Sequence, residues 1–167
     1  MRWLRPRDSR AFTLVEAVIS TIIVAVMLVA ALSAVGASRV IQYKVSLHNR
    51  GRLLAESLLA EIVQQAYEDP NDPVVFGPET GEQTTNREDF DDVDDYDNWS
   101  ESPLEDKDGN EIPQSDDWQW TVAVDWVDPL DPTQVQASET GAKRITVTTK
   151  RNNITHATFV AVRTAHQ

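Results

Sequence analysis

An uncharged stretch of 22 residues, from Ala17 to Ser38, constrains this chain more than any other feature of its sequence. As a helix rising about 1.5 Å per residue, such a segment covers the roughly 30 Å of hydrocarbon in a bilayer. It exceeds the roughly 7 to 15 apolar residues of a secretory signal peptide, which makes cleavage at Val35-Gly36-Ala37 the weaker interpretation. The stretch therefore predicts a membrane-spanning helix, either a plain anchor or one with a leader cleaved in front of it.

The residues before the span bear on this choice. Residues 1–11 carry four arginines and one acid, as expected of a basic leader. Glu16 lies near the start of the span, where an unpaired carboxylate costs roughly 2.5 kcal/mol or more and usually has a partner or a function. The alternative is that Glu16 lies at headgroup depth and is simply solvated.

The run from Arg10 to Glu16, Arg-Ala-Phe-Thr-Leu-Val-Glu, resembles the processing site of type IV pilins and type II secretion pseudopilins. In that family a small residue precedes Phe, and Glu is the fifth residue after the cut. The resemblance implies that a prepilin peptidase cleaves between Ala11 and Phe12 and methylates the new amino terminus at Phe12. Because Ala11 stands where the family usually has glycine, we expect slower cleavage.

The resemblance also implies a location and a set of partners. The chain would cross the inner membrane once, in contact with lipid, with its head on the periplasmic side. It would then join other pilins or pseudopilins in a filament at an inner-membrane assembly platform. Glu16 of a neighbour would pair with the positive amino terminus of each added subunit, because pairing removes two desolvation penalties together. Charge alone does not set the orientation, since cations also flank the far end of the span: Arg39, Lys44, Arg50 and Arg52.

The helical pattern continues beyond the membrane half, residues 12–38. Apolar or small residues recur three or four positions apart, and no proline occurs between Pro6 and Pro70. We therefore expect one helix from Phe12 to about Tyr67, ended by Asp69-Pro70, with an amphipathic half over residues 39–69. The helix is expected to be least stable at Gly36 and Gly51, because glycine has a low helix propensity. The stripe consists of Leu47, Gly51, Leu54, Leu58, Ile62 and Ala66.

Residues 70–167 are expected to form a β-rich head. Alternation predicts a strand over 118–126, whose apolar face should lie on the helix stripe. Two further strands are expected over 144–150 and 154–163, joined by a turn at 151–153, and Val74-Val75-Phe76 is a short strand candidate. The prediction is an α+β fold: a long amino-terminal helix on a small antiparallel sheet. This matches the pilin-like fold that the leader implies.

An acidic loop, residues 88–117, interrupts the head. It holds 14 of the 27 acids and one of the 15 basic residues, so the rest of the chain nets 14 − 13 = +1. Apolar residues spaced three apart, from Phe90 to Trp99, argue against disorder. Two interpretations stay open, a solvated acidic surface and a calcium site, and major type II pseudopilins bind calcium in a loop of the head. The candidate ligands are Asp89, Asp91, Asp92, Asp94, Asp95 and Asp97.

Several classes of protein are disfavoured. The absence of cysteine excludes disulfides and thiolate chemistry, and the net charge of −12 argues against nucleic-acid binding. No catalytic motif is present, so we expect no enzyme. The leading hypothesis is a minor pilin or pseudopilin. The head differs from those of major pilins in having no cysteine pair, and its acidic loop would repel the same loop on adjacent copies in a filament. The alternative is a membrane-anchored periplasmic domain that binds calcium or a partner and never polymerises; only the first hypothesis needs processing at Phe12.

Overall fold

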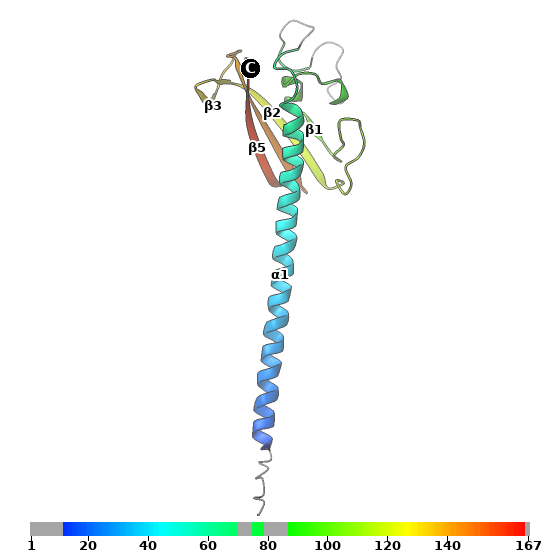
Figure 1. The fold of residues 1–167 in the computed structure, drawn as a ribbon, viewed down its shortest axis with the longest axis vertical. Coiled ribbons are helices and arrows are strands. Elements are labelled where there is room, and N and C mark those ends of the chain that lie inside the picture. The colour runs from blue at the N-terminus through cyan, green and yellow to red at the C-terminus, as the bar shows by residue number, and fades with distance from the viewer. Residues whose placement is uncertain (1–11, 70–74, 79–86, 166–167) are drawn as a thin grey trace, which may run out of the picture. The chain divides into compact units, whose positions relative to one another are not determined.

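The structure is a computed structural model that describes residues 12–69, 75–78 and 87–165. The helix α1 (Leu14–Ile62) comes first, and the two short 3₁₀ turns η1 (Arg87–Asp89) and η2 (Asp94–Tyr96) follow. The strands β1 (Ser100–Glu101), β2 (Trp118–Asp128), β3 (Asp131–Val135), β4 (Ala142–Arg151) and β5 (Ile154–Thr164) complete the chain (Figure 1). A long helix with a small antiparallel sheet confirms the predicted α+β, pilin-like fold class.

The chain divides into two compact units, residues 1–45 and the head unit from Ser46 onward. In the head unit the sheet has the order β1-β2-β4-β5, with β3 paired to the other end of β2. All these strand pairs are antiparallel. Val122 of β2 lies opposite Val147 of β4, and Val147 lies opposite Phe159 of β5. The three long strands β2, β4 and β5 therefore make up most of the sheet.

The β4–β5 hairpin turns where the sequence predicted. Asn152 and Asn153 have φ angles of 49° and 62°, both in the left-handed region. Asparagine tolerates this region better than most residues, and two such residues match the twist of the flanking strands. The strands expected over 144–150 and 154–163 are thus confirmed as β4 and β5.

The helix ends at Ile62 rather than near Tyr67, so the predicted end is wrong by about one turn. After Ile62 the backbone tightens, and the Gln65 N–H donates to the Ile62 carbonyl at 3.1 Å. Ala66 then pairs with the acidic segment instead: its N–H donates to the Asp91 carbonyl at 3.2 Å, and its carbonyl accepts from Val93 N–H at 3.1 Å. This pairing with a segment 25 residues away replaces the last helical turn.

The core lies between the second half of α1 and the inner face of the sheet. The stripe residues Leu54, Leu58 and Ile62 are buried, and they share one cluster with Trp118 and Trp120 of β2. The predicted contact between helix stripe and strand face is therefore confirmed. The remaining members of the cluster are Ala55, Phe90, Val93, Tyr96, Trp99, Leu104, Val122, Val124, Ile145, Val147 and Ala157.

Two details at the end of β2 differ from simple alternation. The register shifts between Val127 and Asp128, and Val127 is fully buried while Trp126 is only partly buried. Trp126 stacks edge-on against Phe76, with ring centroids 4.6 Å apart. Val75 and Phe76 form no strand, so that prediction is wrong for these two residues, and Val74 lies outside the described residues.

Glycine has a packing role at one helical position that was expected to be soft. The helix runs through Gly36 and Gly51 without a break. A Cβ atom added at Gly51 would lie 2.6 Å from the Cβ of His156 and 3.2 Å from the Trp118 ring, whereas one added at Gly36 would meet nothing within 4 Å. Gly51 therefore permits close approach of β5 to the helix.

Candidate assembly site and the polar interior of the head

The candidate assembly site lies at the start of α1. Phe12 is exposed, and the Thr13 hydroxyl accepts a hydrogen bond from the Glu16 N–H at 3.3 Å. Glu16 lies in the first helical turn and is exposed, and within the part of the chain that the structure describes its carboxylate has no hydrogen bond or ion pair. The first turn of the helix thus carries an exposed carboxylate. Ala11, the predicted residue before the cut, lies outside the described residues.

Thr13 is a site residue that the sequence reasoning missed. Its side chain satisfies one backbone donor at the helix start, and its carbonyl accepts the Ala17 N–H at 3.1 Å, as expected of an N-cap. The signal was present, because Thr13-Leu14-Val15-Glu16 has the T-x-x-E spacing of a capping box. Of the two hydrogen bonds in that motif, the one from the Glu16 backbone N–H to the Thr13 hydroxyl forms, and the helix starts at Leu14, two residues after Phe12.

The first half of α1 has the properties of a membrane span. The helix is long and apolar enough to cross a bilayer, and the apolar window lies wholly exposed near the amino terminus. Together with the residues around Glu16, this helix fits a membrane-anchored, single-pass protein.

Comparison with known proteins agrees with this site. Residues 6–32 match the family model described as the prokaryotic N-terminal methylation motif. That motif is the hallmark of type IV pilin-like and pseudopilin proteins, so the predicted resemblance is confirmed for this segment. No curated protein and no solved structure matches the chain.

In the head, the acidic loop folds around its own carboxylates. Asp92 Oδ1 accepts hydrogen bonds from the N–H groups of Asp94 at 2.8 Å and Asp95 at 3.2 Å. Asp95 Oδ2 accepts in turn from the N–H groups of Asp91 at 2.9 Å and Asp92 at 3.0 Å. These bonds stabilise the turn η2, and they satisfy backbone donors that burial would otherwise leave unpaired.

The apolar residues of the same loop anchor it to the core, as predicted. Phe90, Val93, Tyr96 and Trp99 are all buried. The rings of Phe90 and Tyr96 meet edge-on with centroids 4.9 Å apart. Apolar spacing of three residues therefore produced a folded segment rather than a solvated tail.

A buried ion pair joins this loop to the sheet. Lys143 Nζ contacts Asp94 Oδ1 and the Tyr67 carbonyl, and it lies 4.4 Å from the centroid of the Tyr67 ring. Both charged side chains are almost fully buried. Asp94 Oδ2 also accepts the Gly77 N–H at 3.2 Å. The pair therefore fixes the loop onto β4, and neither charge has water to replace a lost partner.

The burial of so many carboxylates changes their protonation. Desolvation, together with the neighbouring charges of Asp94 and Asp95, raises the pKa of Asp92 to about 8, and Lys143 opposes this rise. Desolvation likewise raises the pKa of Asp91. Near neutral pH, the cluster formed by Asp92, Asp94 and Asp95 therefore holds a proton.

A second buried cation was not foreseen from the sequence. Arg87 lies between Trp99 and Trp120, with its guanidinium carbon 5.3 Å from each ring centroid. It also pairs with Glu61 at 3.2 Å and with Glu101 at 3.3 Å. Arg87 thereby links α1 to the loop. The only sequence signal is a single basic residue directly before the acidic run.

The predicted calcium ligands do not form a visible metal site. Within residues 12–69, 75–78 and 87–165, no three Asp, Glu or His side chains converge as metal ligands. Asp92, Asp94 and Asp95 act as described above, and Asp97 Oδ1 accepts the Val124 N–H at 2.9 Å. Calcium binding by Asp89, Asp91, Asp92, Asp94, Asp95 and Asp97 stays a prediction.

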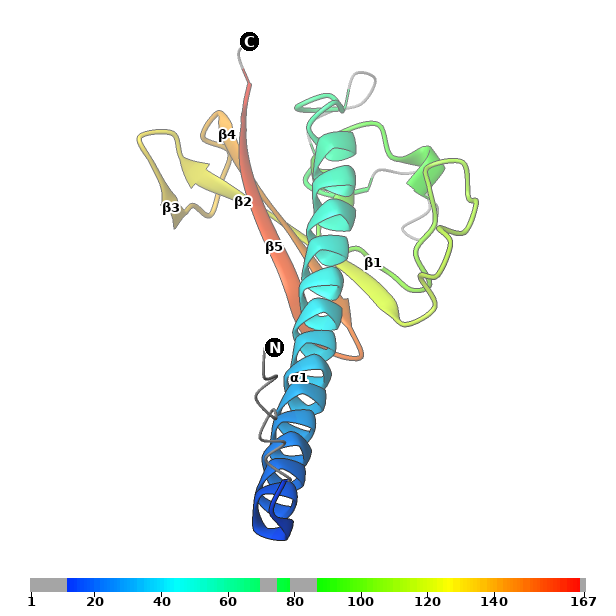
Figure 2. The same ribbon diagram turned by 60° about the horizontal axis from the view of Figure 1, so that its bottom comes forward.

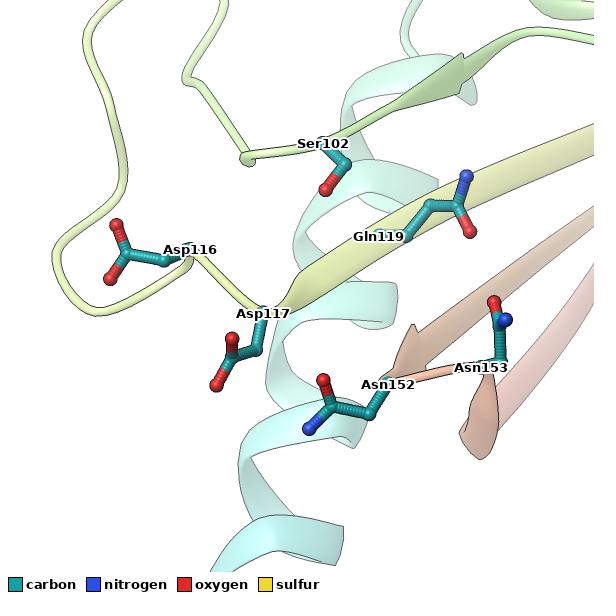
Figure 3. A pocket seen from close by; sticks show the side chains of 6 residues that line it. All are labelled: Ser102, Asp116, Asp117, Gln119, Asn152 and Asn153. Carbon is teal, nitrogen blue, oxygen red and sulfur yellow. The ribbon is translucent and has the colours of Figure 1, made fainter.

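A polar hollow of about 320 Å³ lies where β2 begins. Its lining comes from the end of β1, the start of β2 and the β4–β5 turn (Figure 3). The Asp117 carboxylate pairs with Arg151 at 3.1 Å, and the Asp117 carbonyl accepts the Asn152 N–H at 3.2 Å. These bonds hold the hairpin turn against β2, so Asp117 and Asn152 at the hollow have a structural role.

Proposed function

We propose that this protein is a minor pilin or pseudopilin subunit of a type IV pilus or type II secretion filament. A prepilin peptidase removes residues 1–11 and methylates Phe12, and the subunit then assembles through α1. Removing the leader subtracts four basic residues and one acid, which takes the net charge from −12 to −15.

One observation carries this proposal. The methylation motif over residues 6–32 coincides with the start of an exposed apolar helix whose first turn contains Glu16. A carboxylate with no partner among the described residues of its own chain, at the edge of an apolar segment, is costly unless another group supplies the countercharge. The amino terminus of an adjacent subunit is such a countercharge.

The features of the head support a minor role for the subunit. The acidic loop concentrates 14 carboxylates, and its exposed members would repel the same loop on adjacent copies in a filament of identical heads. A low-copy position avoids this repulsion. In this proposal the head faces the periplasm, and the partners are other pilins or pseudopilins, membrane lipid and the inner-membrane assembly platform.

The test is the mass of the amino-terminal peptide of protein purified from the membrane of its host. We expect N-methylated Phe12. Ala11→Gly restores the small residue that the family usually has and should be cleaved at least as fast, whereas Ala11→Lys should leave the leader attached. These two variants change the same position and separate cleavage from expression.

An intact Met1, or a start at Ser38, would overturn the proposal. The alternative of an anchored periplasmic domain that binds calcium or a partner would then be favoured. Processing at Phe12 in wild type but equally in Ala11→Lys would also contradict the proposed peptidase, because that enzyme is expected to need a small residue before the cut.

A further inference from the structure

The strand β5 is an open edge of the sheet. Within the described residues it pairs only with β4, and it is 11 residues long, with no proline and no acid. Alternate N–H and C=O groups of an edge strand point away from the sheet and are available to another strand. Natural edges are usually protected by proline, by charged residues, by bulges or by short length; β5 is long, has no proline, and has one bulge near its amino-terminal end and one charged residue near its carboxyl end.

A groove of about 410 Å³ accompanies this edge. His48 and Arg52 of α1 form one wall, and residues 155–159 of β5 form the other. Both ribbon views show β5 beside the part of α1 that lies in the head (Figure 2), and within the described residues β4 is the only strand that pairs with β5. An extended chain that paired with β5 would therefore place side chains beside His48 and Arg52.

A β-bulge shapes the groove. Thr149 pairs with Ala157, but the next residue, Lys150, pairs with Thr155, so His156 is an extra residue in β5. The bulge brings His156 against Trp118, with centroids 5.2 Å apart, and to 6.2 Å from the His48 ring. The missing side chain of Gly51 makes this approach possible. Bulges commonly redirect a side chain in this way at sheet edges.

The groove lies in a basic part of the head. From Thr140 to Ala165 the chain contains no acid but five lysine or arginine residues. Three of these five pair with acids elsewhere, namely Lys143, Arg144 and Arg151. In the described residues Arg52 has no ion pair, and the acidic loop lies on the other side of α1 from β5 (Figure 1). Desolvation lowers the pKa of His156, and the charges of His48 and Arg151 lower it further.

We propose that β5 and this groove accept an extended acidic strand from the head of a different, neighbouring subunit, a setting that rests on the proposed filament function. The strand adds to the sheet through backbone hydrogen bonds, and its carboxylates contact Arg52 and His48. The chain's own acidic loop is not the occupant in a second copy, because its anchors Phe90 and Tyr96 are buried in its own core. Charge complementarity selects the occupant, and the open edge fixes its conformation.

The test uses the full chain in detergent micelles and three synthetic peptides of equal length. One alternates valine with glutamate, one alternates valine with lysine, and the third is the glutamate peptide with a central proline. We expect the glutamate peptide alone to slow amide hydrogen exchange in β5. Exchange in β3, another edge strand, should not change, because the acidic side chain of Asp131 in that strand would repel the glutamate peptide.

Charge reversal at the groove tests the side-chain part of the proposal. Arg52→Glu should weaken the glutamate peptide by about tenfold and give measurable binding of the lysine peptide. Arg39→Glu is the matched control, since it reverses a charge on the same helix outside the groove, and it should leave both affinities unchanged. Equal binding of both charged peptides by wild type, or no protection of β5, would overturn the proposal.

The two proposals fail separately. Protection of β5 by the glutamate peptide in a chain that its host leaves unprocessed would support the groove and contradict the filament function. Processing at Phe12 without peptide binding would do the reverse.

Discussion

The two halves of α1 obey the same helical geometry but find their packing partners in different places. From Leu14 to Val45 every residue is exposed, whereas from Ser46 onward Gly51, Leu54, Leu58 and Ile62 are buried in the head. Apolar surface of this extent in water would be strongly unfavourable, since burial contributes roughly 25 cal/mol per Å². The first half therefore needs an apolar environment such as lipid, while the second half is covered by its own sheet.

This difference predicts two separable kinds of variant. Changes in the head should alter the free energy of unfolding and leave the affinity of the helix for its neighbours intact. Changes at the start of α1 should alter assembly and leave the head folded. A variant that did both in equal measure would break the comparison.

The largest expected effect on folding is at Lys143. Lys143→Ala leaves Asp94 buried without its cation, beside Asp92 and Asp95, and should cost about 3 to 5 kcal/mol of unfolding free energy. Urea unfolding of the full chain in micelles, followed by tryptophan fluorescence, measures this. Lys150→Ala on the same strand is the control and should change stability by no more than about 0.5 kcal/mol. Similar losses in the two variants would show that the buried pair is not important.

The next effect concerns the first half of the helix. Under the proposed function Glu16→Ala removes the countercharge for an adjacent amino terminus, and a loss of about 2.5 kcal/mol corresponds to roughly sixtyfold less incorporation into filaments. Filament content after shearing from host cells measures it, and the urea transition of the head should not move. Glu56→Ala, an exposed acid in the second half of the same helix, should assemble normally. Normal assembly of Glu16→Ala would leave this glutamate as a solvated residue.

The two helical glycines sharpen the comparison within one element. Gly51→Ala should destabilise the head by about 1 to 3 kcal/mol, because its new Cβ would lie 2.6 Å from the Cβ of His156. Gly36→Ala meets no neighbour and should leave the unfolding of the head unchanged. Parallel urea titrations of both variants decide the matter, and a stable Gly51→Ala protein would show that β5 does not approach the helix so closely.

A smaller effect is expected from pH. The pKa of Asp92 is raised from 3.8 in an unfolded chain to about 8 in the fold, so between these values the folded head holds a proton that the unfolded chain releases. Stability should therefore fall as pH rises through this window. Asp92→Asn keeps an acceptor oxygen and should remove about 1 to 2 kcal/mol of the difference between pH 5 and pH 8, less than the roughly 4 kcal/mol that three pH units allow, because Asp94 and Asp95 can take up part of the proton binding. Asp116→Asn, an exposed control, should keep the wild-type profile.

The smallest effect is expected from calcium. Asp92, Asp94, Asp95 and Asp97 already accept hydrogen bonds or pair with Lys143. Calcium should therefore raise the free energy of unfolding, measured by urea, by no more than about 0.5 kcal/mol. Titration of the metal-free protein with calcium measures the shift. A larger shift that Asp89→Asn abolished would favour the calcium site that the sequence suggested.

Local patterns were sufficient for much of the fold. Strict alternation located β2, and the asparagine pair located the β4–β5 turn, because both depend only on neighbouring residues. The end of α1 was misplaced because Ala66 leaves the helix to pair with Asp91 and Val93, and no local pattern reports such a contact. Alternation also placed Trp126 on the inner face, opposite the buried Lys143 of β4, but it could not foresee the shift of register after Val127.

The candidate site divides in the same way. Phe12 and Glu16 could be proposed from the sequence because the methylation motif is contiguous, and even the overlooked Thr13 has a local signal. Lys143 and Arg87 were not found, because their partners come from segments far apart in the chain. The groove at β5 depends on a bulge and on a glycine about a hundred residues earlier, so only the folded structure brings its parts together.

The cap at Thr13 has an electrostatic consequence for a chain cleaved after Ala11. The new amine would stand one residue before the cap, at the end of a helix whose aligned peptide dipoles carry about half a positive charge. Each incoming subunit would then present about one and a half positive charges to a single carboxylate. Part of the attraction thus belongs to the backbone, so side-chain substitutions should weaken the addition of a subunit without abolishing its preference for an anionic neighbour.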